Sequence, residues 1–309
     1  GGAATYRRMR LAIAAAAALL VCLYYLWQAR TANGPFEWRR DLNGYYDLLA
    51  RGWLSGHLHV AVEPSPKLLA LPNPWDPSVD DSLKWQDMAL YNGHYYLYFG
   101  AAPAAVLFAP WRLVARHDLP ENFAAFLLCF GGYLFSCGAL ARVLDLAGAR
   151  PGPIVLAFLF LGLGVCQSAV FLLNRTAVYE VAIASGYCFT MAGLFSLAHG
   201  FDRRVNLAIA GLMFGLAAAS RPHLAFAGAI ALAALVVLDV RRKSRAWVAF
   251  AAAFALAGAA IAIYNYERFG SPVEFGFRYQ LAGPGQNRVE VSPRNLPAGF
   301  YYMLLSRPE

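Results

Sequence analysis

Apolar residues gather in blocks along this chain of 309 residues, and short polar stretches separate most of the blocks. The first block covers 11–27, and a long polar segment follows it. Seven further apolar blocks come after that segment, at 101–115, 123–144, 153–173, 177–198, 205–219, 223–239 and 247–264. A helix that crosses the hydrocarbon core of a bilayer needs about 20 residues, and most blocks approach that length. The pattern predicts an all-α polytopic membrane protein.

The placement of the arginines reduces the expected number of crossings. Three arginines within 7–10 precede the first block, and because positively charged flanks stay in the cytoplasm, the N-terminus is expected there. Eight alternating crossings would then put the richest basic cluster, at 241–245, on the outer side. The same count would misplace Arg142, Arg150, Arg203 and Arg204. One block must therefore lie along the membrane rather than cross it.

The block at 101–115 is the one that we expect not to cross. It holds only about 15 residues, which is short for a span. It also contains Pro103 and Pro110 and ends in Trp111-Arg112, which is typical of an interface. We expect a juxtamembrane helix in the outer interface. About seven transmembrane helices remain, and the misplaced basic positions return to the cytoplasmic side.

The polar segment after the first span carries a turn signal. In the stretch 90–96, Asn92-Gly93 supplies the positive-φ turn between two aromatic strands, so a β-hairpin is expected. This segment is therefore predicted to be a small extracytoplasmic subdomain between spans one and two.

We expect four parts along the chain. They are an N-terminal transmembrane helix at 1–28, an outer loop with hairpin and juxtamembrane helix at 29–120, transmembrane helices two to seven at 121–265, and an extracytoplasmic segment at 266–309. The chain stops at Glu309 just after a new apolar run at 300–305. We therefore expect it to be a fragment of a longer protein.

The composition agrees with a membrane location and excludes other classes. Hydrophobic residues make up 59% of the chain and charged residues 14%, where a soluble domain has about a quarter. The net charge of +8 does not indicate nucleic-acid binding, because most basic residues lie in short loops between apolar blocks. None of the cysteines has CxxC spacing, so they are expected to be buried apolar side chains rather than metal ligands. They are Cys22, Cys129, Cys137, Cys166 and Cys188.

Polar groups that could carry chemistry fall on the outer side of this topology. Arg175 and the segment Arg221-Pro222-His223 each lie between two apolar spans, and ionisable groups at membrane depth tend to be functional. A basic pocket there would suit a lipid phosphate. Two structural alternatives stay open, since Arg175 could pair with Glu180 and Arg221 could cap a helix end.

The acidic and aromatic groups of the outer loop have structural alternatives as well. Asp41 follows Trp38-Arg39-Arg40, so it could form an ion pair rather than act as a catalytic carboxylate. His94 could be a packing residue of the hairpin. Tyrosine pairs, which are typical of the membrane interface, could also line a sugar site. The pairs are Tyr45-Tyr46, Tyr95-Tyr96 and Tyr301-Tyr302.

Three motifs stand in a recognisable order. The acidic stretch 41–51, Asp-Leu-Asn-Gly-Tyr-Tyr-Asp-Leu-Leu-Ala-Arg, follows the first span. Gly93-His94-Tyr95-Tyr96 then leads to Pro103, and 264–272 reads Tyr-Asn-Tyr-Glu-Arg-Phe-Gly-Ser-Pro. This order resembles the GT-C superfamily of membrane glycosyltransferases, in the branch of protein O-mannosyltransferases and aminoarabinose transferases. Those proteins have an N-terminal span and then an outer loop that opens with an acidic motif.

The chain departs from that family at two places. Leu42 stands where the second acid of the family's pair would be. The stretch 98–102 lacks the basic residue that aminoarabinose-type enzymes place before the proline. A non-catalytic assembly protein with this fold is therefore an alternative, and a transporter of lipid-linked glycans is another.

The resemblance implies transfer of a sugar from a polyprenyl-phosphate donor to an acceptor glycan, lipid or protein outside the membrane. It implies a multi-pass protein of the bacterial inner membrane. Asp41 would be the general base, and Asp87 would assist or hold a divalent metal ion that the reaction does not require. The remaining expected contacts divide into phosphate ligands (Arg175, Arg221, His223) and sugar or acceptor contacts (Tyr45, Tyr46, His94, Tyr95).

Overall fold

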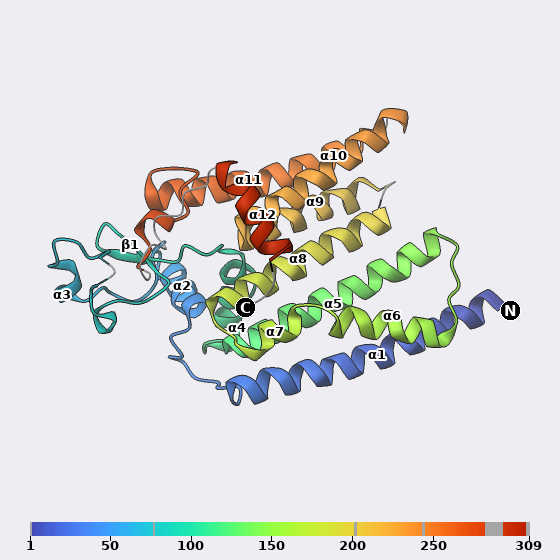
Figure 1. The fold of residues 1–309 in the computed structure, drawn as a ribbon, viewed down its shortest axis with the longest axis horizontal. Helices are drawn as coiled ribbons and strands as arrows, with labels where there is room; N and C mark the ends of the chain where they lie inside the picture. Colours follow the sequence, from blue (N-terminus) through green and yellow to red (C-terminus); the bar gives the residue numbers. More distant parts are fainter. Residues whose placement is uncertain (1, 77, 201–202, 243–244, 282–292, 307–309) are drawn as a thin grey trace. The chain divides into compact units, whose positions relative to one another are not determined.

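The computed structural model describes residues 2–76, 78–200, 203–242, 245–281 and 293–306. Within these ranges the chain is mostly helical, and the strands form one two-stranded sheet (Figure 1). Contacts divide the chain into two compact units. The bundle unit is Gly1–Val62 with Phe99–Phe275, and the hairpin unit is Glu63–Tyr98 with Gly276–Glu309. The expectation of a helical membrane protein with little sheet is confirmed.

Long helices make up most of the bundle unit. Its short elements are α2 (Tyr45–Leu54), the π-helical turn η2 (Ala104–Phe108), α4 (Ala109–Ala115), α7 (Ala169–Asn174) and the 3-10 turn η3 (Pro222–Leu224). Its longer helices are α1 (Gly2–Asn33), α5 (Glu121–Leu146), α6 (Pro153–Val165), α8 (Val178–Gly200), α9 (Arg204–Ser220), α10 (Ala225–Arg242) and α11 (Trp247–Phe269).

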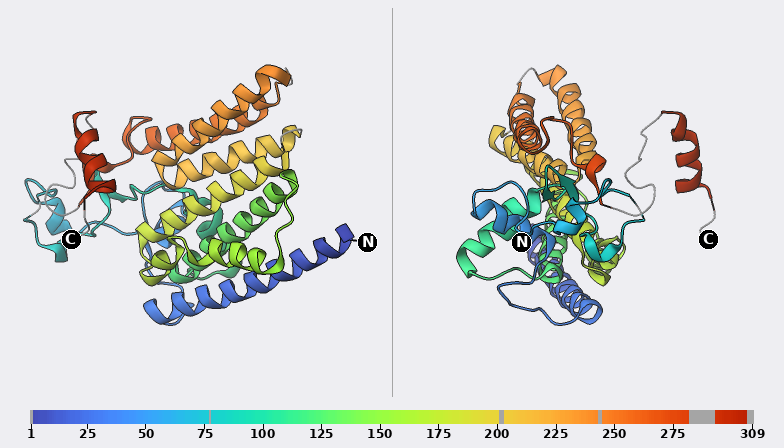
Figure 2. Two further views of the ribbon diagram at one scale, coloured as in Figure 1. Left: turned by 45° about the vertical axis from the view of Figure 1, so that its right-hand side comes forward. Right: turned by 90° about the vertical axis from the view of Figure 1, so that its left-hand side faces the viewer.

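The long helices of the bundle unit pack side by side. Helix α1 lies against α5, α6 and α7, α5 packs on α8, α8 packs on α9, and α9 packs on both α10 and α11. The left view of Figure 2 shows this succession of helices. From α5 onward short connections join the long helices, so consecutive long helices run in opposite directions and bring alternate ends together.

Hydrogen bonds between different helices define the two ends of the bundle. At one end, Asn33 of α1 donates from Nδ2 to Leu173 O at 2.7 Å and accepts from Thr176 N at 2.9 Å. We call this the Asp47 end, after the carboxyl described below. At the other end, Arg10 of α1 donates to Asp145 of α5 at 2.6 Å and 3.0 Å. We call this the Arg10 end.

Within the described residues, four helices are long and apolar enough to cross a membrane, at Ala4–Asn33, Glu121–Leu146, Val178–Gly200 and Trp247–Phe269. The other expected spans form shorter apolar helices, and the one expected at 153–173 is interrupted between α6 and α7. The count of seven crossings stays a prediction. The block at 101–115 forms only the short helix Ala104–Ala115, which packs against α2.

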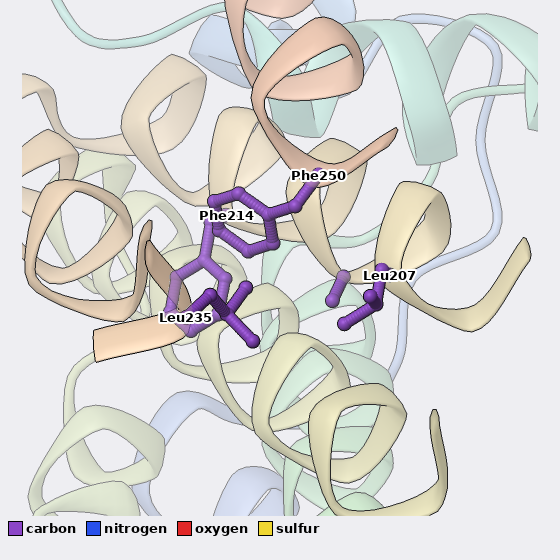
Figure 3. Close-up of a cluster of buried hydrophobic side chains, with 5 residues drawn as sticks. Leu207, Phe214, Leu235 and Phe250 are labelled. Carbon is purple, nitrogen blue, oxygen red and sulfur yellow. The ribbon is translucent and has the colours of Figure 1, made fainter. Parts of the chain in front are cut away.

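Small residues let α9 and α11 approach closely around a core of aromatic side chains. Phe214 and Phe250 lie with their ring centres 5.8 Å apart (Figure 3). Leu207, Ala210 and Leu235 complete this buried cluster. A Cβ on Gly211 would lie 2.2 Å from Phe250 O, so α11 touches the bare backbone of α9 there. Such small-residue contacts are typical of helix pairs in membranes.

The hairpin unit contains the predicted hairpin. Strand β1 (Ala89–Tyr91) pairs antiparallel with β2 (His94–Tyr96), and the turn residues Asn92 and Gly93 have φ of 48° and 78°. On the other edge of β1, Ala89 bridges to Gln280 and Leu281 N donates to Met88 O at 2.8 Å. Two stretches that are far apart in sequence therefore build one small sheet.

Two short helices and three 3-10 turns are also described in the hairpin unit. They are α3 (Pro66–Leu69), η1 (Asp81–Leu83), η4 (Phe277–Tyr279), η6 (Pro293–Asn295) and α12 (Leu296–Leu304). Lys243 of the expected basic cluster lies outside the described residues, as do 282–292 and 307–309 of the expected C-terminal segment.

The contact at Gly211 predicts a specific sensitivity to a methyl group. We expect Gly211→Ala to lower the midpoint of thermal unfolding in detergent micelles by several degrees, because helix α9 or α11 must move to make room. The matched control is Gly258→Ala on α11, where an added Cβ meets nothing within 4 Å. Equal midpoints for the two variants would contradict this packing.

Candidate functional site

A reciprocal set of hydrogen bonds ties helix α2 and the loop before it to the turn that begins α5. Asp118 is fully buried and accepts from Leu42 N at 3.0 Å, while Asp118 N donates to Arg39 O at 2.9 Å. Its carboxylate also pairs with Arg112 and lies 3.6 Å from Arg51. A buried carboxylate with two guanidinium partners and a backbone donor is well satisfied, so this pairing fixes the acidic motif against the bundle.

Asp47, in the first turn of α2, is the most unusual carboxyl in this set. Its side chain is 1% exposed, and its Oδ1 accepts from Leu119 N at 3.0 Å. Its Oδ2 is buried and has no hydrogen-bond partner among the described residues. Such an unsatisfied buried oxygen calls for an explanation, and a protonated or ligand-binding carboxyl is one.

Burial, the largest cause, together with the negative charges of Asp118 and Glu121 raises the pKa of Asp47 to about 8. The Leu119 N–H and the Arg51 charge oppose this rise. Burial disfavours the charged form of an acid, which is why the shift is upward. A carboxyl whose pKa lies near neutral pH can both take up and release a proton.

An open pocket of about 310 Å³ lies beside Asp47 at this end of the bundle. Polar residues of five different segments line most of it, including Asn33, Asp47, Glu121, Asn122 and Thr176. A Cβ on Gly44 would lie 3.0 Å from Asp47 Oδ2 and 3.2 Å from Glu121 Oε1. The two carboxyl groups therefore converge on the bare backbone of Gly44, where a larger residue would crowd them.

Tyr46 connects this pocket to Arg221. Its side chain is fully buried, and its hydroxyl donates to Gly100 O at 3.3 Å. Burial raises its pKa above the usual value, with the charge of Arg221 opposing the rise and that of Glu121 adding to it. The hydroxyl of Tyr46 thus lies within electrostatic reach of both the acidic pocket and the guanidinium.

Arg221 follows α9 and lies among aromatic rings. Its guanidinium carbon is 5.5 Å from the ring centre of Phe99 and 5.2 Å from that of Tyr179. Its Nη2 donates to Tyr179 O at 3.2 Å, and its Nε is buried with no hydrogen-bond partner among the described residues. No carboxylate pairs with it among the ion pairs of the described residues. Arg221 therefore retains a donor and its full charge for an anion.

Close packing of backbone holds Arg221 near the motif. A Cβ on Gly100 would lie 2.0 Å from Ala219 O and 2.4 Å from Ser220 O, so only glycine fits there. Because Tyr46 donates to the carbonyl of this same glycine, the end of α9 and helix α2 are both anchored to one backbone position.

Three other sequence-predicted residues of the bundle unit lie at the surface of this end, whereas Tyr45 is half-buried and donates from its backbone N–H to Glu121 Oε1 at 3.1 Å. Asp41, Arg175 and His223 are exposed, and none of them lines the 310 Å³ pocket. The residues on both sides of Asp41 form hydrogen bonds, since the Arg40 carbonyl accepts from Arg112 and Leu42 N donates to Asp118. The backbone of Asp41 is therefore held, while its carboxylate faces solvent. Glu180, the alternative partner of Arg175, accepts from Ala177 N at 3.2 Å instead.

The other predicted residues belong to the hairpin unit. Asp87 has a positive φ of 58° and accepts from the Tyr98 hydroxyl at 3.0 Å, and that hydroxyl accepts from Gln280 Nε2 at 2.7 Å. Tyr95 is buried, and its hydroxyl accepts from Trp85 N at 3.4 Å. His94 Nδ1 lies 3.7 Å from a carboxylate oxygen of Glu63. These contacts give Asp87 and Tyr95 roles in holding the small sheet.

Sequence reasoning did not single out Glu121, Asp118 or Arg51 as site residues. Asp118 and Glu121 precede and open an apolar helix, where acidic residues are usually attributed to capping and the helix dipole. The sequence offers one signal for these residues. The acidic start of α5 could be matched with a second acid, Asp47, which lies four residues before Arg51. Only the fold brings those two stretches together.

Comparison with protein-family models, with curated proteins and with solved structures gives no match for this chain.

The raised pKa of Asp47 predicts how stability depends on pH. In the unfolded chain an aspartate ionises near pH 4, whereas the folded protein keeps the Asp47 proton up to about pH 8. The folded state thus binds more protons between these values, and its stability falls as pH rises through this window. We expect Asp47→Asn to remove that fall, so the variant melts at a higher temperature than the wild type above pH 8.

Thermal unfolding in detergent at several values between pH 5 and pH 9 tests this. The exposed Asp41→Asn variant is the matched control and should keep the wild-type dependence. Parallel curves for Asp47→Asn and the wild type would show that Asp47 is not buried as described.

Proposed function

We propose that the chain is a membrane glycosyltransferase that moves a sugar from a polyprenyl-phosphate donor to an acceptor hydroxyl at the Asp47 end of the bundle. The observation that carries the proposal is the pocket in which the carboxyls of Asp47 and Glu121 converge. Arg221 supports it, because its buried Nε has no hydrogen-bond partner among the described residues, and such a guanidinium suits a reaction that releases a phosphate.

The proposed reaction uses these groups in one displacement. The acceptor oxygen forms a bond to the anomeric carbon of the sugar, and the bond from that carbon to the lipid phosphate oxygen breaks. The Asp47 carboxylate takes the proton of the acceptor hydroxyl. The released polyprenyl phosphate gains negative charge, which Arg221 stabilises.

Asp47 replaces Asp41 as the proposed base. Asp47 lines the pocket and has a pKa of about 8, whereas Asp41 is exposed and lies outside the lining. A base works best when its pKa is near the operating pH. In this proposal Asp41, Arg175 and His223 contact the donor or acceptor at the mouth of the site.

The proposal includes seven crossings, with the Asp47 end outside and the Arg10 end in the cytoplasm of a bacterial inner membrane. The shorter helices α6, α9 and α10 would cross in addition to the four long ones, with α7 continuing α6. The distribution of arginines supports this orientation. Helix ends and links at the Arg10 end carry Arg7, Arg8, Arg142, Arg150, Arg203 and Arg204.

The test is an assay of the purified protein with polyprenyl-phosphate sugars, in which release of the lipid phosphate is measured. We expect Asp47→Asn to lower the rate by about 10²- to 10⁴-fold, as loss of a general base does. We expect Arg221→Gln to lower it as well, because charge on the leaving phosphate loses its partner.

The control is Glu267→Gln, which removes an exposed acid from the last turn of α11 at the same end. It should keep the wild-type rate. A full rate for Asp47→Asn together with a lost rate for Asp41→Asn would return the role of base to Asp41. No release from any polyprenyl-phosphate sugar would favour a non-catalytic assembly protein.

A transporter of lipid-linked glycans is the second candidate, and one observation favours it. The apolar segment 153–174 is broken between α6, which ends at Val165, and α7, which begins at Ala169. Broken helices are typical of transporter substrate sites. Reconstitution in vesicles separates the two functions, since a transporter moves the intact lipid-linked sugar across the bilayer without releasing phosphate.

A further inference from the structure

A second and larger pocket lies at the opposite end of the bundle, which the proposed transfer reaction does not use. Its volume is about 600 Å³. It is formed where the beginning of α1 meets the last turns of α5, the link to α6 and the end of α8. It is lined by Tyr6, Arg7, Arg10, Leu11, Gly138, Ala141, Arg142, Leu144, Asp145, Gly148, Ala149, Arg150 and His199.

The lining of this pocket is strongly basic. Four arginines face one carboxylate, that of Asp145. Arg10, which is 9% exposed, donates to both oxygens of that carboxylate, at 2.6 Å and 3.0 Å. Its Nη1 also donates to Ala141 O. The charges of Arg7, Arg142 and Arg150 are therefore not neutralised by an acid of the lining.

Two of the four basic groups, Arg10 and Arg142, are held in place by hydrogen bonds, whereas Arg7 and Arg150 are exposed. Arg142 donates from Nε to Ala198 O at 3.2 Å, which joins the end of α5 to the end of α8. Tyr6 donates to Pro151 O at 3.3 Å, which joins α1 to the link before α6. These contacts fix the helix ends around the pocket, so Arg10 and Arg142 are preorganised, and Arg7 and Arg150 add charge beside them.

The pocket also has an apolar side. Leu11 and Leu144 belong to the lining, and Leu11 is 57% exposed one residue after the buried Arg10. Leu146 and Ile154 near the same end are also exposed, at 58% and 71%. In a membrane protein such exposed aliphatic side chains face lipid chains, whereas the guanidinium groups lie at the level of the headgroups.

We propose that this pocket binds a phosphate-bearing anion, and that the anion is the headgroup of an anionic phospholipid with its chains along Leu11. Guanidinium groups bind phosphate oxygens through paired, charge-assisted hydrogen bonds. Basic pockets between transmembrane helices on the cytoplasmic side suit such headgroups. Retention of positive charge in the cytoplasm alone would need arginines but no cavity and no buried Arg10 paired with Asp145.

The test compares lipids on the purified full chain in dodecyl maltoside by native mass spectrometry. Dioleoylphosphatidylglycerol is the anionic probe and dioleoylphosphatidylcholine the zwitterionic one. We expect the wild type to hold the anionic lipid about tenfold or more tightly than the zwitterionic one. Arg142→Gln with Arg150→Gln should abolish this preference, because two of the lining charges are lost.

The matched control is Arg203→Gln with Arg204→Gln, which removes two exposed charges at the same end but outside the lining. It should keep the preference. Since Arg142 also joins two helices, the single variant Arg150→Gln is tested in parallel. Arg150 is exposed, so this variant should fold like the wild type and still bind the anionic lipid more weakly.

Calorimetric titration with inorganic pyrophosphate distinguishes a lipid from a soluble anion. A phosphate site with a soluble ligand is supported if pyrophosphate binds saturably, the pocket variants lose this binding, and the protein shows no preference for the anionic lipid. Preference for the lipid that only the pocket variants lose supports the lipid headgroup. The proposal is overturned if neither probe binds, or if the pocket and control variants weaken binding equally.

Discussion

The exchange of hydrogen bonds between the acidic motif and the turn before α5 is the constraint on which the rest of the Asp47 end depends. Asp118 and Asp47 each accept a backbone N–H from the other's segment, through Leu42 and Leu119. Removing either carboxylate would leave a buried donor unpaired, which costs more than a typical hydrogen bond contributes. This clamp holds α2 on the bundle, and α2 in turn carries Asp47 to the pocket and Tyr46 toward Arg221.

The same clamp explains why two carboxyls of one motif differ. Asp41 and Asp47 are six residues apart, yet Asp41 is exposed while Asp47 is 1% exposed. Arg112 and Arg51 neutralise the charge of Asp118. Among the described residues, Asp47 therefore has no cation of its own in close contact. Its charge is therefore unfavourable in the folded protein, and its pKa rises to about 8. The paired acid, Asp118, then has a structural role, and Asp47, whose charge is not paired, is the one suited to proton transfer.

The two ends of the bundle have opposite electrostatic character. The pocket at the Asp47 end is lined by three acids and two amides, and Arg221 lies beyond Tyr46. The pocket at the Arg10 end contains four arginines and one acid. Helices such as α9 and α11, which touch through bare backbone at Gly211, connect these ends through an apolar core. Such a distribution of charge favours one orientation of the helices in a membrane, while close packing holds the helices together.

The sequence by itself determined the membrane class, the helical content, the Asn92-Gly93 hairpin and the short helix at 104–115. These features depend on local composition and spacing, which need no knowledge of distant contacts. The number of crossings does not follow from local composition and spacing, because the length of a helix such as α6 depends on where its helical geometry ends. The pocket was decided by the tertiary structure alone. Gly44, Asp47 and Glu121 come from two segments more than 70 residues apart, and burial, which selects Asp47 over Asp41, arises only when those segments meet.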